Sequence, residues 1–168
     1  KIKLSLKKLI KVNPYYVGGL AVALSLLFRC GLFLSPAIGV AAFFSWRIFV
    51  GDIKTRKVDN WDILGLLVGG GLMCLADASF ELSIIRPIIV FLIGWGMFQL
   101  FEGDIGGGDV RLATVVAVFL NTVQLLSAIS LAAAAGMLIG SKLKMKTVPF
   151  GSLLIVASWL SFWIVRFR

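Results

Sequence analysis

The chain has 168 residues, of which 60% are hydrophobic, and its formal net charge is +9 at pH 7. An ordinary soluble domain contains about 45–50% apolar residues, so this composition excludes a soluble globule and predicts an integral membrane protein. The sequence contains no histidine, which excludes Ser-His and Cys-His nucleophile pairs and HExxH zinc sites. Its eight aspartates and glutamates are therefore the main candidates for proton chemistry.

Apolar stretches of helical length follow one another along the chain. A bilayer core about 30 Å thick requires about 17–25 residues per transmembrane helix. The predicted spans are residues 15–32, 35–51, 61–77, 83–101, 109–120, 122–140 and 148–165. The fifth is too short to cross unless it tilts or borrows residues from its neighbour, so six or eight spans are alternatives to seven. We predict an all-α polytopic membrane helix bundle of about six to seven transmembrane helices, forming a single domain over residues 15–168.

Basic residues mark the segments expected on the cytoplasmic side. Residues 1–14 form a basic N-terminus, and lysines and arginines recur at 52–60 and 141–147, whereas 78–82 has none. Positive loops stay in the cytoplasm, so seven spans place these basic segments and the loop at 102–108 on that side. The positive charge thus indicates topology and contact with a lipid bilayer, and we expect no nucleic-acid partner. We also expect no cleavable signal peptide, because further spans follow the first apolar run.

The cysteines and several glycines fit a packed helical bundle. Cys30 and Cys74 are far apart and form no CxxC motif, so they predict small apolar core residues rather than a zinc site or a disulfide framework. The stretches GLLVG (65–69) and GMLIG (136–140) are small-xxx-small patterns. Such patterns let helix backbones approach closely, either within the bundle or in a homodimer.

Two aspartates stand at the same predicted edge of the apolar layer, because Asp52 ends the second span and Asp109 opens the fifth. Asp109 alone could be a helix N-cap, whereas Asp52 lies at a helix C-terminus, where a negative charge is unfavourable. Two facing aspartates share a single proton near neutral pH, so that one takes a proton from water while the other donates to a carbonyl oxygen. This aspartic-protease chemistry requires no histidine, metal or cofactor.

Three glycines, Gly106, Gly107 and Gly108, directly precede Asp109. Glycine is a poor helix former, and non-helical backbone at membrane depth is tolerated only inside protein or beside a wet cavity. We interpret the glycines as room for a peptide backbone beside the carboxylates. A flexible interhelical loop is the alternative.

Three motifs resemble those of one known family. GGGDVRL (106–112) resembles the GxGD motif of type IV prepilin peptidases, especially the short stand-alone members that serve Flp/Tad-type pili. Upstream, DIKTRKVDN (52–60) resembles the first motif of the family, although Asp59 replaces a proline. Downstream, VPFGSLL (148–154) resembles the family's Pro-Phe-Gly segment. The three motifs occur in the family's order and on one predicted side of the membrane.

The resemblance implies an aspartic endopeptidase in the bacterial inner or plasma membrane, with its active site facing the cytoplasm. It would remove the basic leader of prepilins or pseudopilins before a hydrophobic helix, without a metal or cofactor. By motif, the catalytic pair would be Asp52 and Asp109. The residues expected to bind substrate are Gly106, Gly107, Gly108, Asn60, Pro149, Phe150 and Gly151. Larger members carry CxxC motifs and also N-methylate the product. This chain has no CxxC motif, so we predict no methyltransferase function.

Other acidic residues near the motifs receive different interpretations. Asp104 is the rival of Asp109, but together with Glu102 it predicts a solvated loop, with contact to the basic leader of the substrate as the alternative. Asp59 and Asp62 are predicted to cap the third span.

Two arginines lie in or beside the predicted spans. Arg47 is a candidate functional residue inside the second span, although it can extend to the interface, and Arg111 is predicted to extend to lipid headgroups.

A different function could use the same two aspartates. The rival is an ion- or proton-coupled transporter or channel component, in which Asp52 and Asp109 carry protons or bind cations. A non-enzymatic membrane scaffold and an inactive relative with the same fold are also compatible with the sequence.

Overall fold

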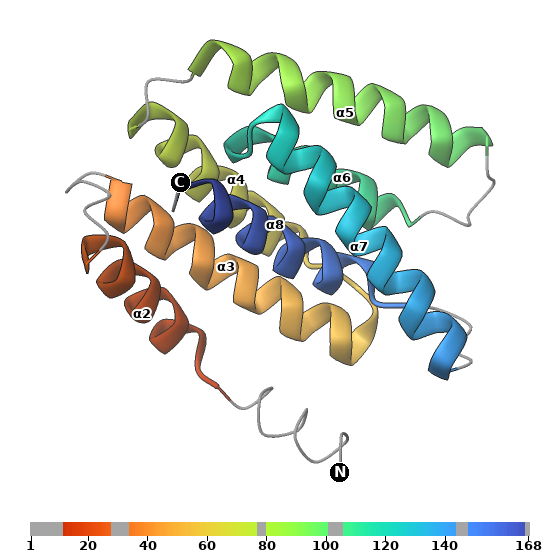
Figure 1. The fold of residues 1–168 in the computed structure, drawn as a ribbon, viewed down its shortest axis with the longest axis horizontal. Coiled ribbons are helices and arrows are strands. Elements are labelled where there is room, and N and C mark those ends of the chain that lie inside the picture. The colour runs from red at the N-terminus through yellow and green to blue at the C-terminus, as the bar shows by residue number, and fades with distance from the viewer. Residues whose placement is uncertain (1–11, 28–33, 77–79, 101–105, 144–147, 167–168) are drawn as a thin grey trace.

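The computed structural model describes residues 12–27, 34–76, 80–100, 106–143 and 148–166, which form seven helices and no strand (Figure 1). In chain order the helices are α2 (Pro14–Leu27), α3 (Leu34–Thr55), α4 (Asn60–Ala76), α5 (Phe80–Leu100), α6 (Gly107–Phe119), α7 (Thr122–Leu143) and α8 (Phe150–Arg166). The all-α helix bundle predicted from the sequence is confirmed, and each helix overlaps one predicted span.

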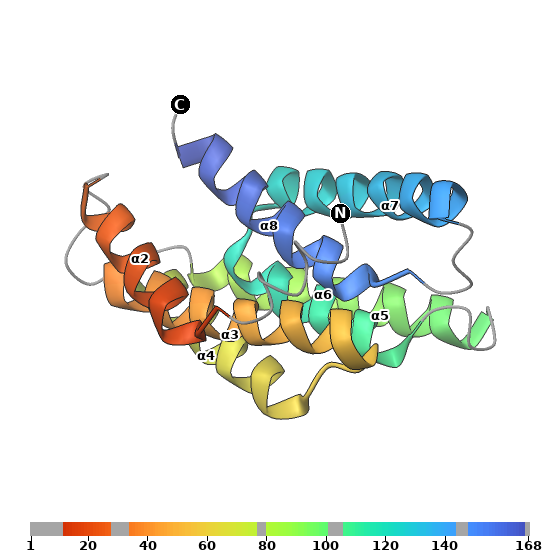
Figure 2. The ribbon, with the colours of Figure 1, turned by 90° about the horizontal axis from the view of Figure 1, so that it is seen from below.

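The helices run up and down, so the three motifs gather at one end of the bundle. Figure 1 shows α3, α5 and α7 ending, and α4, α6 and α8 beginning, toward the same end. Figure 2 shows α7 and α4 on opposite sides of the bundle, with α6 between them. The alternation of the helices therefore places the end of α3 near the beginnings of α6 and α8.

Helix α6 corresponds to the segment predicted to be too short to cross a membrane alone. Its 13 residues extend about 20 Å, which is less than the about 30 Å of a bilayer core. It packs against α4, α5, α7 and α8. Its fully buried side chains include Leu112 and Val116. Protein therefore surrounds this helix, and its shortness is compatible with a place in the core.

Close packing of α3 and α4 depends on the predicted small-xxx-small pattern. A Cβ on Gly69 would lie 2.7 Å from the backbone nitrogen of Ala41, so only glycine fits there. Gly65 lies against the ring of Phe44 in the same way. The prediction for residues 65–69 is confirmed, and the contact is within the bundle.

The connection between α3 and α4 is held at both ends. Helix α3 ends at Thr55, and Arg56 directly after it has a left-handed backbone with φ of 56°. Helix α4 begins with a cap, because Asp59 Oδ1 accepts a hydrogen bond from the Trp61 N–H at 3.1 Å. The predicted capping role of Asp59 is therefore confirmed, and the start of α4 is fixed beside the end of α3.

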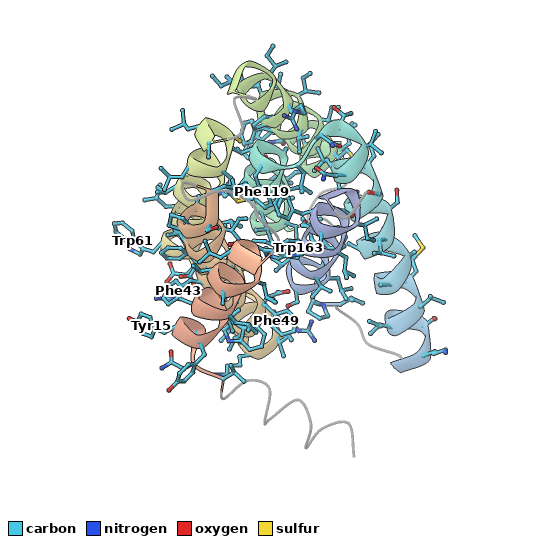
Figure 3. The ribbon with its side chains drawn as sticks, turned by 60° about the vertical axis from the view of Figure 1, so that its left-hand side comes forward. Tyr15, Phe43, Phe49, Trp61, Phe119 and Trp163 are labelled. Carbon is cyan, nitrogen blue, oxygen red and sulfur yellow. The ribbon has the colours of Figure 1, made fainter. Side chains whose placement is uncertain are left out.

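The outer surface of the bundle is rich in large apolar side chains. On α5, Leu92 and Ile93 are more than half exposed, and Figure 3 shows Tyr15 and Trp61 pointing away from the bundle. By length and composition, two helices in the described part of the chain, Leu34–Thr55 and Thr122–Lys142, could cross a membrane. A soluble protein rarely exposes apolar area of this kind without a partner that covers it.

Candidate active site

Asp52 lies in the last turn of α3 and only 6% of its surface is exposed. Its Oδ2 accepts two hydrogen bonds from Ser152, one from the backbone N–H at 2.7 Å and one from the hydroxyl at 2.8 Å. Ser152 is itself buried in the first turn of α8. The buried carboxylate is therefore held by donors that a buried charge requires.

The position of Ser152 explains how an acid is accommodated at the C-terminal end of α3. The first N–H groups of a helix have no partner within that helix, and they carry the positive end of its dipole. The field of α3 disfavours a negative charge at Asp52, and the N-terminus of α8 offsets that effect. Asp52 thus acts as a cap for α8 supplied by a different helix.

Gly151 lies where α3, α6 and α8 meet. A Cβ on this residue would be 3.2 Å from Asp52 Oδ2 and 3.3 Å from Leu112 Cδ2. Leu112 follows Asp109 by three residues in α6, so the two share a face of that helix. Gly151 of the Pro-Phe-Gly segment therefore lies between the Asp52 carboxylate and the helix that carries Asp109.

Asp109 lies in the first turn of α6 and is half-buried. The N-cap of α6 is Gly106, whose carbonyl accepts a hydrogen bond from the Asp109 N–H at 2.9 Å. The alternative that Asp109 is the N-cap is therefore wrong, because the helix begins before it. Asp52 and Asp109 both lie at the end of the bundle where α3 ends and α6 begins. The structure thus brings the two predicted catalytic aspartates to one end of the bundle.

The three glycines before Asp109 have different surroundings. Gly106 is extended, and a Cβ there would lie 3.1 Å from Asp109 Oδ2. Gly107 and Gly108 already belong to α6, so the alternative of a flexible interhelical loop is wrong for these two residues. Among the described residues, no atom outside the adjoining backbone of α6 lies within 4 Å of a Cβ placed on Gly108. Space beside the start of α6 is therefore open at Gly108.

Asn60 and Arg111 connect the first two motifs. Asn60 begins α4, and its Oδ1 accepts a hydrogen bond from Arg111 Nη1 at 3.2 Å. The prediction that Arg111 extends to lipid headgroups is corrected, because its guanidinium donates to a neighbouring motif. Pro149 and Phe150 form the start of α8, where the Pro149 carbonyl accepts a hydrogen bond from the Leu153 N–H. Their placement sets the position of the residues that touch Asp52.

An ion pair that the sequence did not predict joins α3 and α4. Arg47 Nε lies 2.8 Å from Asp62 Oδ1, and the Asp62 side chain is 9% exposed. The predicted capping role of Asp62 is therefore wrong, because its carboxylate pairs with Arg47 while Asp59 caps the helix. Arg47 is explained by this pair rather than by extension to the interface.

The structure describes one of the two cysteines and neither of the acidic residues that precede the GxGD motif. Cys30, Glu102 and Asp104 lie outside the described residues, whereas Cys74 is buried and donates from Sγ to the Val118 carbonyl. Within the described ranges, no group of three histidine, cysteine, aspartate or glutamate side chains could hold a metal ion.

Sequence reasoning missed Ser152, the residue that fixes Asp52. The signal was present, because VPFGSLL places a hydroxyl and free backbone N–H groups at the start of a helix. A buried carboxylate needs donors of that kind. The VPFGSLL motif could therefore have been interpreted as the first turn of a helix that binds a carboxylate.

The fold and the site define an all-α protein with two neighbouring carboxylates at one end of a helical bundle. A family model described as the type IV leader peptidase family matches residues 39–141, which include both aspartates. The match covers more than half of the chain, so the chain belongs to this family and the resemblance seen in its motifs is confirmed. The family is one of peptidases, generally membrane-embedded, and it implies prepilin substrates. No curated protein and no solved structure matches the chain.

Proposed function

We propose that this protein is a membrane aspartic endopeptidase that removes the leader peptide of type IV or Flp-type prepilins or pseudopilins. The observation that supports the proposal is that Asp52 and Asp109, from two separate motifs, lie at the same end of the bundle. Membership of the leader peptidase family supports the substrate class. No metal or cofactor takes part in the proposed reaction.

The proposed reaction uses the two carboxyl groups as base and acid. One carboxylate takes a proton from water, and the water oxygen attacks the carbonyl carbon of the scissile peptide bond. The other carboxyl group donates its proton to the carbonyl oxygen. When the tetrahedral intermediate collapses, the carbon–nitrogen bond breaks and the nitrogen, which becomes the new amino terminus, takes the proton that the first carboxyl group had received from water. The second carboxylate takes back a proton from a hydroxyl of the intermediate as the carbonyl re-forms, so the pair returns to its starting state. The open space at Gly108 would admit the peptide backbone.

The proposed location is the bacterial inner or plasma membrane, with several spans and the active site facing the cytoplasm. The apolar outer surface and the two helices long enough to cross a bilayer support this location. The basic segments at 52–60 and 141–147 support the orientation. We further propose a basic cytoplasmic segment over residues 1–14 and one membrane-embedded peptidase domain over 15–168.

The central experiment is co-expression with a prepilin that has a basic leader, a glycine and then a hydrophobic helix. Wild-type protein should remove the leader, and Asp52→Asn and Asp109→Asn should each lower the rate by about 10²-fold or more, because each removes a proton-transfer group. Asp104→Asn is the matched control and should cleave normally. No cleavage by wild type, or normal cleavage by either dyad variant, would contradict the proposal and favour a transporter role.

A further inference from the structure

The two aspartates lie on helices whose relative position depends on the helices packed beside them. Asp52 belongs to α3 and Asp109 to α6, and both of these helices pack against α4 and against α8. Toward α8, Ser152 and Gly151 hold the Asp52 carboxylate as described above. Toward α4, two polar contacts lie near the aspartates within the described part of the chain. The proposed reaction itself uses neither of these two contacts.

Two adjacent glycines bring α4 close to both α3 and α6. A Cβ on Gly69 would lie 2.7 Å from the backbone nitrogen of Ala41 in α3, and a Cβ on Gly70 would lie 2.8 Å from Phe119 Cδ1 in α6. These contacts are about 14 Å along the helix from Asn60, the first residue of α4, so they are remote from the aspartates. The position of α6 relative to α3 at the aspartate end therefore depends on other contacts.

The ion pair of Arg47 and Asp62 anchors the first turn of α4 to α3. Arg47 Nε lies 2.8 Å from Asp62 Oδ1, and the Asp62 side chain is 9% exposed. Loss of the cation would leave a buried carboxylate without a partner, which is strongly unfavourable. Arg47 precedes Asp52 by five residues, which is about 8 Å along α3. The start of α4 is therefore fixed close to the first aspartate.

The hydrogen bond of Asn60 and Arg111 joins the same turn of α4 to α6. Arg111 Nη1 donates to Asn60 Oδ1 at 3.2 Å. Arg111 follows Asp109 by two residues, which is about 3 Å along α6. Asn60 and Asp62 are also two residues apart, so their side chains point to different sides of α4. One turn of α4 therefore contacts α3 with one side chain and α6 with the other.

We propose that Asn60 and Arg111 are positioning residues, whose hydrogen bond sets the position of Asp109 relative to Asp52. The first turn of α4 connects the two, because its ion pair holds α3 while this hydrogen bond holds α6. The inference rests on the proposed function, since the relative position matters only if both carboxyl groups act on one peptide bond. In this role neither side chain touches the substrate, which differs from the substrate-binding role that the resemblance implied for Asn60.

Kinetics of leader cleavage with a purified prepilin test the two residues one at a time. Asn60→Leu keeps nearly the same shape without an acceptor, and Arg111→Met removes the donor. Each should lower kcat about tenfold while KM stays within about twofold, because displaced reacting groups slow the chemical step. Both side chains are exposed, so the melting temperature should change little. Lys142→Met, which removes an exposed cation in the last turn of α7, is the control and should change neither constant.

A double variant and a conservative variant separate positioning from substrate binding. Asn60→Leu combined with Arg111→Met should still lower kcat only about tenfold, because both substitutions break the same hydrogen bond. Asn60→Asp keeps an acceptor oxygen for the guanidinium and should retain at least about half of the wild-type kcat. If the two side chains bound substrate independently, KM would rise and the two losses would multiply.

Several outcomes would overturn the positioning role. These are an unchanged kcat in both single variants, losses that multiply in the double variant, or a raised KM as the main effect. The anchor on α3 is tested by Arg47→Met together with Asp62→Leu, since changing Arg47 alone leaves a buried carboxylate unpaired. A folded enzyme of this kind with wild-type kcat would also overturn the proposal.

Wild-type cleavage of the same prepilin is measured in parallel. If wild type cleaves and any of these contrary results appears, the positioning proposal is wrong and the proposed activity stands. If wild type does not cleave, both proposals fail.

Discussion

The two aspartates of the candidate dyad are held in different ways. Asp52 is 6% exposed and accepts two hydrogen bonds from Ser152, while Gly151 packs against its carboxylate. Asp109 is half-buried at the start of α6, and the space at Gly108 beside it is open. One carboxylate is enclosed by a neighbouring helix, and the other lies beside open space at Gly108.

This difference gives separate tasks to the Pro-Phe-Gly segment and to the GxGD motif. The Pro-Phe-Gly segment contributes a helix start that compensates the charge of Asp52 and fixes its position. The GxGD motif contributes a carboxylate beside open space. The proposed reaction would require both, because the reacting groups must be positioned within a fraction of an ångström while the substrate still has access. Substitutions around Asp52 and substitutions around Asp109 should therefore lower the activity in different ways.

The largest expected effect comes from disturbing the enclosed side with Gly151→Val. The added Cβ would lie 3.2 Å from Asp52 Oδ2 and 3.3 Å from Leu112 Cδ2, and the further methyl groups need still more space. Asp52 must then shift, and a displacement of about 1 Å costs about 10²-fold in rate. We expect leader cleavage to fall by that factor in kcat, measured with a purified prepilin in detergent.

The matched control is Gly71→Val, because in the part of the chain that the structure describes no atom beyond the adjoining backbone of α4 lies within 4 Å of a Cβ at that position. It should fold and cleave like the wild type. If Gly151→Val cleaves at the wild-type rate while remaining folded, close packing against Asp52 is not needed for activity.

A smaller effect is expected from Ser152→Ala, which removes the hydroxyl donor of Asp52 but keeps the backbone donor. A hydrogen bond to a charged group contributes about 1.5–3 kcal/mol, so kcat should fall by at least about tenfold. Ser158→Ala is an equally buried control on the same helix, whose hydroxyl donates to the Leu154 carbonyl at 2.6 Å. Equal rates for the two variants would show that the Ser152 hydroxyl does not position Asp52.

The sequence predicts the helices of this protein well, because each apolar run has the length of one helix. The predicted span at 122–140 becomes α7 (Thr122–Leu143), and even the short segment at 109–120 becomes α6 (Gly107–Phe119). The length and polarity of a run are local properties. These properties do not depend on how the helices are arranged, so the order of apolar and polar residues along the sequence is sufficient to locate the helices.

The contacts between helices are less predictable. The pairing of Asp52 with Asp109 was expected only from the resemblance of the motifs to a family, since nothing in their spacing brings α3 to α6. The pair of Arg47 with Asp62 and the donor role of Ser152 depend on which faces of the helices meet. Helix crossing angles and rotations set these contacts, and a hydrophobic pattern does not specify them.

The smallest expected effect concerns the open side and is tested with Gly108→Ala. Alanine is more favourable than glycine within a helix by about 1 kcal/mol, and no atom lies within 4 Å of the added Cβ, so the variant should be as stable as wild type or more so. If the open space admits the substrate backbone, KM should rise about threefold with little change in kcat.

The control is Gly96→Ala on α5, where an added Cβ also meets no atom of the described residues within 4 Å, and this variant should leave KM unchanged. A more stable Gly108→Ala enzyme with normal KM would mean that glycine is not needed there for access. The enclosed side would then carry all the positioning that the site requires, and the contrast between the two carboxylates would concern only how each is held.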